Sequence, residues 1–207
     1  MAAKNSDLHG NAPDNSDMAL ILIDVINDLA FDDGKALLKH AVPMAKRIAA
    51  LKARAKQSGI PSIYVNDNFG RWQSDFQKVI EHCLAADSCG KPLASLLQPA
   101  EDDYFVLKPK HSGFYSTTLD LLLTSLGVKT LVLTGIAGNI CVLFTANDAY
   151  MRDYHLIIPA DCVASKTVKE NNNALELMKN VLKADVRAST ALDFHKLLLP
   201  NRDNNDG

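Results

Sequence analysis

Three side chains that could carry out nucleophilic chemistry lie where apolar segments of this sequence end. Asp24 and Lys108 each close such a segment, and Cys141 follows a third after a short turn. A thiolate can attack a carbonyl carbon, a carboxylate can accept the thiol proton, and an ammonium group can stabilise negative charge. These residue types at these positions predict covalent catalysis by Cys141.

The turn before Cys141 strengthens this prediction. Residues 130–141 read as a buried strand, a sharp turn containing Gly135 and Gly138, and the first turn of a helix. The positive end of a helix dipole lowers the pKa of a thiol and favours the thiolate. Backbone amides exposed by such a turn could form an oxyanion hole. The alternative is that Cys141 is a small buried apolar residue, as we expect for Cys162.

Asp24 and Lys108 each allow a simpler interpretation. Burial among apolar neighbours would raise the pKa of Asp24 and make it a proton acceptor, whereas a nearby lysine would lower that pKa. Asp24 could instead be solvated at a strand end or cap the following loop. Lys108 could mark a strand end at the surface. The segment after it, with His111 and Phe114, suits a loop over a ligand or an apolar lid on the next helix.

Other common chemistries lack their motifs. The sequence contains no GxGxxG, no GxxxxGK[ST] and no GxSxG, which argues against nucleotide binding and against a serine nucleophile. None of the six histidines has another histidine or a carboxylate at metal-ligand spacing on an expected strand end. His155 is expected to be structural, and His111 is the one possible substrate contact. We therefore expect neither a metal nor a cofactor.

Composition indicates one soluble, folded domain. The chain has 207 residues, 47% hydrophobic and 22% charged, with a formal net charge of −2. No basic run predicts a nucleic-acid partner, and no apolar run approaches the length of a membrane span. Without a secretion signal or a CxxC pair, the four cysteines are expected to be reduced and the protein cytoplasmic. We expect a single domain over 18–200, with disordered tails at 1–17 and 201–207.

Apolar segments and helical segments alternate along the chain. The expected strands are Ala19–Ile26, Pro61–Asp67, Asp103–Pro109, Thr130–Ile136, His155–Pro159 and Asp185–Ser189. Most are continuously apolar, as in a parallel sheet covered on both faces. The expected helices are Val42–Ser58, Thr118–Leu126, Asn139–Arg152, Val168–Ala184 and Ala191–Leu199, and Arg71–Gln98 suits a helix plus a loop over the site. This alternation predicts a three-layer α/β/α domain.

The three residues in their sequence contexts resemble the isochorismatase-like cysteine hydrolases. The resemblance runs from about Ala19 to Ser189. It rests on Leu-Ile-Asp24, on Lys108-Pro-x-x-Ser112-x-Phe114, on Gly135-Ile-Ala-Gly-Asn-Ile-Cys141-Val, and on Thr145-Ala-x-Asp148-Ala. Each motif is modest alone, but their order and spacing together are specific.

The resemblance implies a fold and a mechanism. It implies a six-stranded parallel sheet of order 3-2-1-4-5-6, with Cys141 as nucleophile, Asp24 as base and Lys108 as electrostatic partner. It also implies a cis peptide between Ile136 and Ala137, with the amides of Ala137 and Cys141 as the oxyanion hole. Members of the family make a homo-oligomer plausible here.

Two features narrow the activity that the resemblance implies. Nicotinamidases of the family carry an Asp-x-His metal motif after the second strand, whereas this chain has Asn66–Trp72 without a histidine. True isochorismatases cleave a vinyl ether without a cysteine nucleophile. We therefore expect a metal-independent hydrolase that cleaves a C–N bond of a small amide, carbamoyl or ureido compound through a thioester. Phe31, Trp72 and Phe114 are the expected pocket walls.

Two alternatives remain open. An isochorismatase-type vinyl ether hydrolase would need Asp24 and Lys108 but not Cys141. A catalytically silent binding protein would carry Cys141 as a thiol that senses oxidants.

Overall fold

The computed structural model describes residues 14–69 and 75–198 of the chain, and its centre is a parallel sheet. The strands are β1 (Met18–Ile23), β2 (Ser62–Asp67), β3 (Tyr104–Lys108), β4 (Thr130–Ile136), β5 (His155–Ile157) and β6 (Val163–Ala164). All the paired strands run parallel, in the order β3-β2-β1-β4-β5. Their carboxyl ends therefore meet along one edge, where sites in open parallel sheets form.

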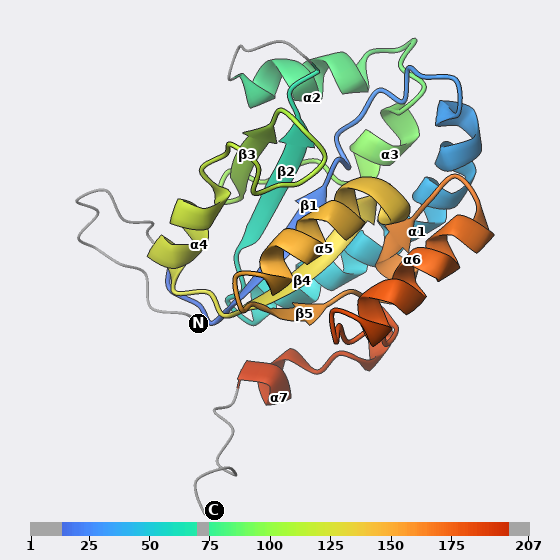
Figure 1. Cartoon of the computed structure of the whole chain (residues 1–207). Helices are drawn as coiled ribbons and strands as arrows, with labels where there is room; N and C mark the ends of the chain where they lie inside the picture. Colours follow the sequence, from blue (N-terminus) through green and yellow to red (C-terminus); the bar gives the residue numbers. More distant parts are fainter. Residues whose placement is uncertain (1–13, 70–74, 199–207) are drawn as a thin grey trace, which may run out of the picture.

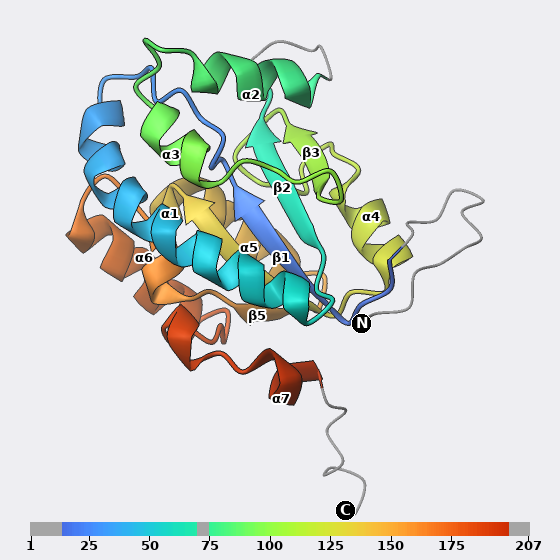
Figure 2. The same cartoon turned by 180° about the vertical axis from the view of Figure 1, so that it is seen from behind.

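Helices cover both faces of this sheet, as Figures 1 and 2 show from opposite sides. One face packs on α1 (Gly34–Gln57), α2 (Phe76–Leu84), α3 (Lys91–Leu96) and α7 (Phe194–Leu198). The other packs on α4 (Leu119–Leu126), α5 (Leu143–Tyr150) and α6 (Val168–Asn180). Every side chain of the central strand β1 is buried, which explains its unbroken apolar sequence. The three-layer α/β/α prediction is confirmed.

The predicted sheet order needs one correction at its last position. The expected strand Asp185–Ser189 is reduced to a single bridge between Asp185 and Ile157. At this point the Asp185 carboxylate accepts the Arg187 N–H at 3.1 Å, a side-chain turn that competes with strand pairing. The sixth strand is β6. It pairs with the end of β4, whereas β5 pairs with the start of β4.

Helix boundaries differ from expectation mainly where the site is built. Helix α1 begins at Gly34 and contains Pro43, whereas the sequence predicted a start at Val42. The predicted helix Asn139–Arg152 begins as a π-helical turn, Gly138–Val142, before α5 continues it. Within the described ranges, no helix is long and apolar enough to cross a membrane.

The described part of the expected N-terminal tail is tied to the domain. The Ser16 N–H donates to the Leu126 carbonyl at 2.9 Å, and the Lys129 N–H donates to the Asp17 carbonyl at the same distance. These bonds extend the start of β1 toward the end of α4, so residues 16 and 17 have defined contacts with the domain.

Candidate active site

The end of β1 and the end of β4 approach each other unusually closely. Ile23 pairs with Gly135, whose φ is +115°. A Cβ atom on Gly135 would lie 2.1 Å from the Ile23 carbonyl oxygen, so a side chain there is excluded. Asp24 follows immediately with a φ of +51°, which turns the chain out of the strand. The turn before Cys141 is thereby held beside Asp24.

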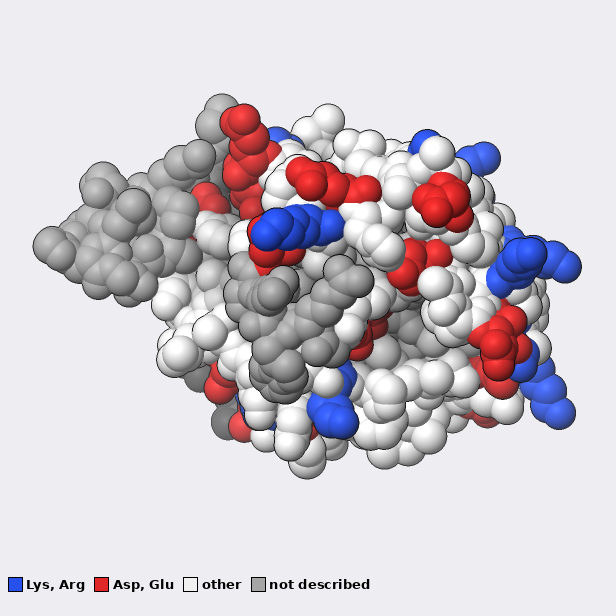
Figure 3. All heavy atoms as spheres, turned by 90° about the horizontal axis from the view of Figure 1, so that it is seen from above, with Lys and Arg blue, Asp and Glu red and all other residues white. Residues whose placement is uncertain are grey.

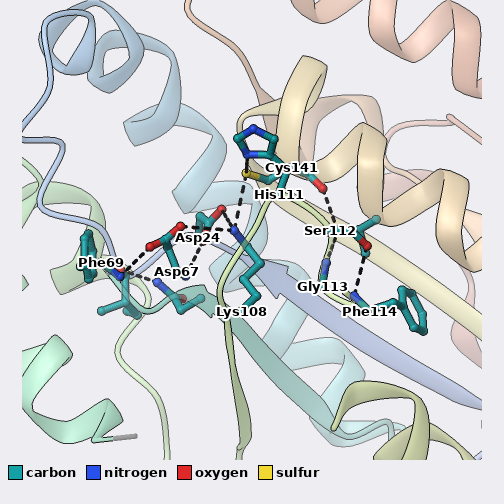
Figure 4. Close-up of polar contacts among 12 residues, drawn as sticks. Asp24, Asp67, Phe69, Lys108, His111, Ser112, Gly113, Phe114 and Cys141 are labelled. Atoms are coloured by element: carbon teal, nitrogen blue, oxygen red, sulfur yellow. Dashed lines mark hydrogen bonds and ion pairs between the residues drawn. The ribbon is translucent and has the colours of Figure 1, made fainter. Parts of the chain in front are cut away.

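Lys108 joins Asp24 to Cys141 from below (Figure 4). Its Nζ lies 2.8 Å from Asp24 Oδ2 and donates to Cys141 Sγ at 3.6 Å. The Lys108 side chain is 0% exposed, although it reaches from β3 past β2 to the end of β1. The structure therefore brings together the three residues, from three separate strand ends, for which the sequence predicted the roles of nucleophile, base and cation.

Cys141 lies within the π-helical turn that starts directly after β4. The N–H groups of Ile140 and Val142 both donate to the Ala137 carbonyl, at 3.0 and 3.2 Å. The amide of Cys141 lies between them. The peptide bond between Ile136 and Ala137 is cis. Single π-helical turns often occur at functional sites.

A side-chain network fixes this turn from behind. Ser165 Oγ accepts the Asn139 N–H at 3.2 Å and donates to Asn171 Oδ1 at 3.1 Å. A Cβ on Gly138 would lie 2.5 Å from that same Asn171 oxygen, which explains why glycine occupies the position. Glycine at position 138 thus leaves room for the Ser165 and Asn171 side chains, which hold the segment that contains Cys141.

The expected low pKa of the Cys141 thiol is wrong for the resting site. Burial and, to a smaller extent, the neighbouring Asp24 carboxylate raise the pKa of Cys141 to about 12, against the opposing effect of Lys108. The helix-dipole interpretation considered only the start of the helix. A thiol with a pKa raised this far is protonated at neutral pH, so it could attack a carbonyl only with a base to accept its proton.

Asp24 is the candidate for that base. Burial raises its pKa, while Lys108, Cys141 and the Asp67 amide lower it through charge or hydrogen bonding, leaving a net increase. Burial lowers the pKa of Lys108, but Asp24 and Cys141 raise it and leave the ammonium charged. A carboxylate with a raised pKa, hydrogen-bonded to a protonated thiol, can accept the proton during attack.

A cavity of about 670 Å³ opens above these residues. Phe31, which the sequence predicted as a wall, lines it, and so does His111, whose Nδ1 lies 3.9 Å from Cys141 Sγ. The predicted wall Trp72 lies outside the described residues. The prediction for Phe114 is wrong, because its side chain is 5% exposed in the core and packs under Arg152, whose Cζ lies 4.7 Å from the ring centroid.

Sequence reasoning did not assign a role to Asp67. Its N–H donates to Asp24 Oδ1 at 2.8 Å, and its Oδ2 lies 4.0 Å from Lys108 Nζ. Asp67 is the register partner of Lys108 in the pairing of β2 with β3. The sequence feature that could have revealed its place in the site is an ionisable residue at the end of the second strand.

No group of three or more His, Cys, Asp or Glu side chains among the described residues is arranged to hold a metal ion. Metal-independent activity stays a prediction.

Thr145 links the Cys141 segment to the loop that follows Lys108. Its Oγ1 donates to the Cys141 carbonyl at 2.7 Å and accepts the Gly113 N–H at 3.0 Å, and the residue is fully buried. One turn further along α5, Asp148 accepts a hydrogen bond from Ser112. These hydrogen bonds thus fix the Cys141 segment and the loop after Lys108 in one relative position.

Replacing Thr145 with valine tests this role. We expect a loss of stability of about 1–3 kcal/mol, because the buried Gly113 N–H loses its acceptor. Turnover should fall about tenfold or more, because small displacements of reacting groups are costly. Denaturant unfolding and steady-state rates measure the two effects. Thr124→Val is the matched control, since Thr124 makes the same backbone bond on an exposed helix face. Equal effects of both variants would contradict the role.

Sequence and structure comparisons agree on the family. The isochorismatase domain family matches residues 18–190, which is most of the chain. The chain belongs to the isochorismatase family. It is 47% identical over 171 residues to the uncharacterized isochorismatase family protein YaaI of Bacillus subtilis (strain 168), covering 83% of this chain and 93% of that one.

Two further members of this family carry names that state an activity. The ureidoacrylate amidohydrolase RutB of Methylorubrum extorquens is 31% identical over 170 residues, covering 69% of this chain and 67% of its own. The structure of N-carbamoylsarcosine amidase from Thermoplasma acidophilum superimposes with a TM-score of 0.66 at 28% identity, covering 85% of this chain and 98% of its own.

Proposed function

We propose that this isochorismatase-family protein is a cysteine hydrolase that cleaves a C–N bond of a small amide, carbamoyl or ureido compound. One observation carries the proposal. At the floor of a cavity of about 670 Å³, the Lys108 ammonium lies 2.8 Å from Asp24 and 3.6 Å from Cys141. A protonated thiol, a base that contacts it and a fixed cation are the groups that attack on a carbonyl requires.

In the first half-reaction the Cys141 proton moves to Asp24 as Sγ bonds to the carbonyl carbon. The amides of Ala137 and Cys141 stabilise the oxyanion. When the tetrahedral intermediate collapses, the C–N bond breaks and Asp24 returns the proton to the leaving nitrogen. The products of this step are a free amine or ammonia and a thioester on Cys141.

In the second half-reaction the Asp24 carboxylate accepts a proton from water. The resulting hydroxide adds to the thioester carbonyl, and collapse breaks the C–S bond. The proton held by Asp24 returns to sulfur, which restores the protonated thiol. Lys108 stays charged throughout and offsets the negative charge that moves between Asp24 and Sγ.

The names of two relatives support hydrolysis of a C–N bond over hydrolysis of an ether. RutB and the Thermoplasma protein are named for a ureido and a carbamoyl substrate. We further propose that this protein acts without a metal, in the cytoplasm and as a homo-oligomer.

A panel of small primary amides, carbamoyl compounds and ureides, assayed by ammonia release, tests the proposal. We expect at least one class to be hydrolysed with saturation kinetics. A vinyl ether substrate, assayed in parallel for its ketone product, addresses the ether hydrolase alternative. Hydrolysis of the ether alone would contradict the proposal. Iodoacetamide labelling of Cys141 with no hydrolysis of any compound would instead favour the silent thiol protein.

A further inference from the structure

Negative charge exceeds positive charge on the lining of the catalytic cavity. Viewed onto the carboxyl ends of the strands, acidic side chains gather around the hollow (Figure 3). The carboxylates that line it are Asp24, Asp28, Asp33, Asp67 and Glu170, whereas Lys166 is the one lysine among the described lining residues.

Among the described residues, the lysine beneath the cavity floor and the lysine at its rim already have carboxylate partners. Lys108 is buried beneath the floor and contacts Asp24 at 2.8 Å, with Asp67 at 4.0 Å. At the rim, Lys166 Nζ lies 2.7 Å from Asp33 Oδ2. Of the described lining residues, then, none is a lysine or arginine available to pair with a substrate carboxylate. His111 lies beside the nucleophile rather than at the rim.

Asp28 is held in a fixed orientation in this lining. Its Oδ1 accepts the Ala30 N–H at 3.0 Å, its Oδ2 contacts His82 Nε2 at 2.8 Å, and its side chain is 18% exposed. An ionised carboxylate has further lone pairs with which to accept hydrogen bonds. Asp67 is more open to the cavity, since its side chain is 40% exposed. Charge of one sign in a hollow concentrates oppositely charged ligands.

We propose that the substrate carries a positively charged amino group at the end remote from the scissile carbonyl, and that the cavity selects against a carboxylate there. This inference rests on the proposed amide hydrolysis and names the substrate class for that site. A substrate with a carboxylate at that end would be repelled by Asp28, Asp33 and Glu170. The proposed substrate class therefore excludes hydrolysis of such anionic compounds as the main activity.

Three simple amides of similar size test the proposal. 4-Aminobutanamide is cationic at its remote end, butanamide is neutral and succinamate is anionic. We expect kcat/KM for ammonia release to fall in that order, with the cationic compound at least about tenfold above the anionic one. Added salt should narrow the difference, since it screens charge at the rim.

Two rim variants should shift this preference in opposite directions. Asp33→Asn leaves Lys166 without its partner and should lower the ratio of cationic to anionic kcat/KM. Lys166→Gln leaves Asp33 without its partner and should raise it. Both side chains are about half exposed, so both variants should fold. Glu176→Gln, an exposed residue of α6 outside the cavity, controls for net charge and should not change the ratio.

The outcomes separate the inference from the proposed function. Hydrolysis of butanamide with equal or faster hydrolysis of succinamate would overturn the charge preference and leave amide hydrolysis standing. Rim variants that both leave the ratio unchanged would also overturn it. If none of the three compounds and no member of the wider amide panel is hydrolysed, the proposed function fails, and this inference fails with it.

Discussion

Cys141→Ala is expected to lower amide turnover by at least about 10⁴-fold, because removing a covalent nucleophile eliminates the intermediate through which the reaction runs. The fold should persist, since Cys141 is only partly buried and forms no disulfide. Ammonia release measures the rate, and thermal unfolding checks the fold.

Cys89→Ala is the matched control for this variant. Cys89 is also a free, partly buried thiol but does not line the catalytic cavity, so its replacement should leave the rate unchanged. A Cys141→Ala protein that retains a tenth of the wild-type activity would contradict the thioester mechanism. It would favour a reaction that needs only Asp24 and Lys108, as in the vinyl ether alternative.

Asp24→Asn should separate two properties that usually change together. Turnover should fall by about 10²–10⁴-fold, because the proton acceptor and donor of both half-reactions is lost. The pKa of Cys141 should nevertheless fall from about 12, because the carboxylate that raises it is gone while Lys108 remains. The variant should therefore be alkylated faster at neutral pH than the wild type, although it hydrolyses more slowly.

Iodoacetamide labelling of Cys141 between pH 7 and pH 11 measures this shift. For the wild type, the rate should rise with pH across most of this range, as expected for a thiol with a pKa of about 12. The rate for Asp24→Asn should level off at a lower pH. An unchanged or higher midpoint would contradict the electrostatic role given to Asp24.

Lys108→Met is the matched comparison for the same measurement. The ammonium lowers the pKa of Cys141, so its loss should lower the labelling rate at each pH of this range while turnover again falls. Each variant leaves a buried charge without its nearest partner, which costs about 3–5 kcal/mol of stability. Circular dichroism therefore has to establish the folded fraction before rates are compared.

The main features of the fold and three site residues were predictable from the sequence. Apolar segments that alternate with helices admit few arrangements, and the strand ends of a parallel sheet share one edge. Asp24, Lys108 and Cys141 each followed an apolar segment, so their convergence depended on topology alone. The glycines at 135 and 138 marked the sharp turn, and the structure shows the atoms that would collide with a side chain at each.

The electrostatics of the site were not predictable in the same way. The helix start predicted a low pKa for Cys141, but the pKa depends on burial and on Asp24, which is 117 positions away in the sequence. Asp67 belongs to no sequence motif. It lies in the site because it is paired with Lys108 in the register of β2 and β3. From the sequence, Phe114 could have lined a pocket or packed in the core. In the structure it packs in the core, where Arg152 covers its ring.

The sheet edge shows a similar limit. We expected a strand over Asp185–Ser189, yet the Asp185 side chain accepts a hydrogen bond from the backbone two residues later, and the pairing is limited to one bridge. Strand β6 has two residues, too few for periodicity to reveal.

Capture of the acyl-enzyme tests the covalent role of Cys141 most directly. The wild-type protein would be mixed with an amide that it hydrolyses, quenched in acid at a series of times, and digested for mass spectrometry, with hydroxylamine added in parallel reactions. We predict an acyl adduct on the peptide that contains Cys141, formed no more slowly than turnover, together with a hydroxamate product. C–N cleavage that proceeds with neither adduct nor hydroxamate at any time would contradict a thioester on Cys141.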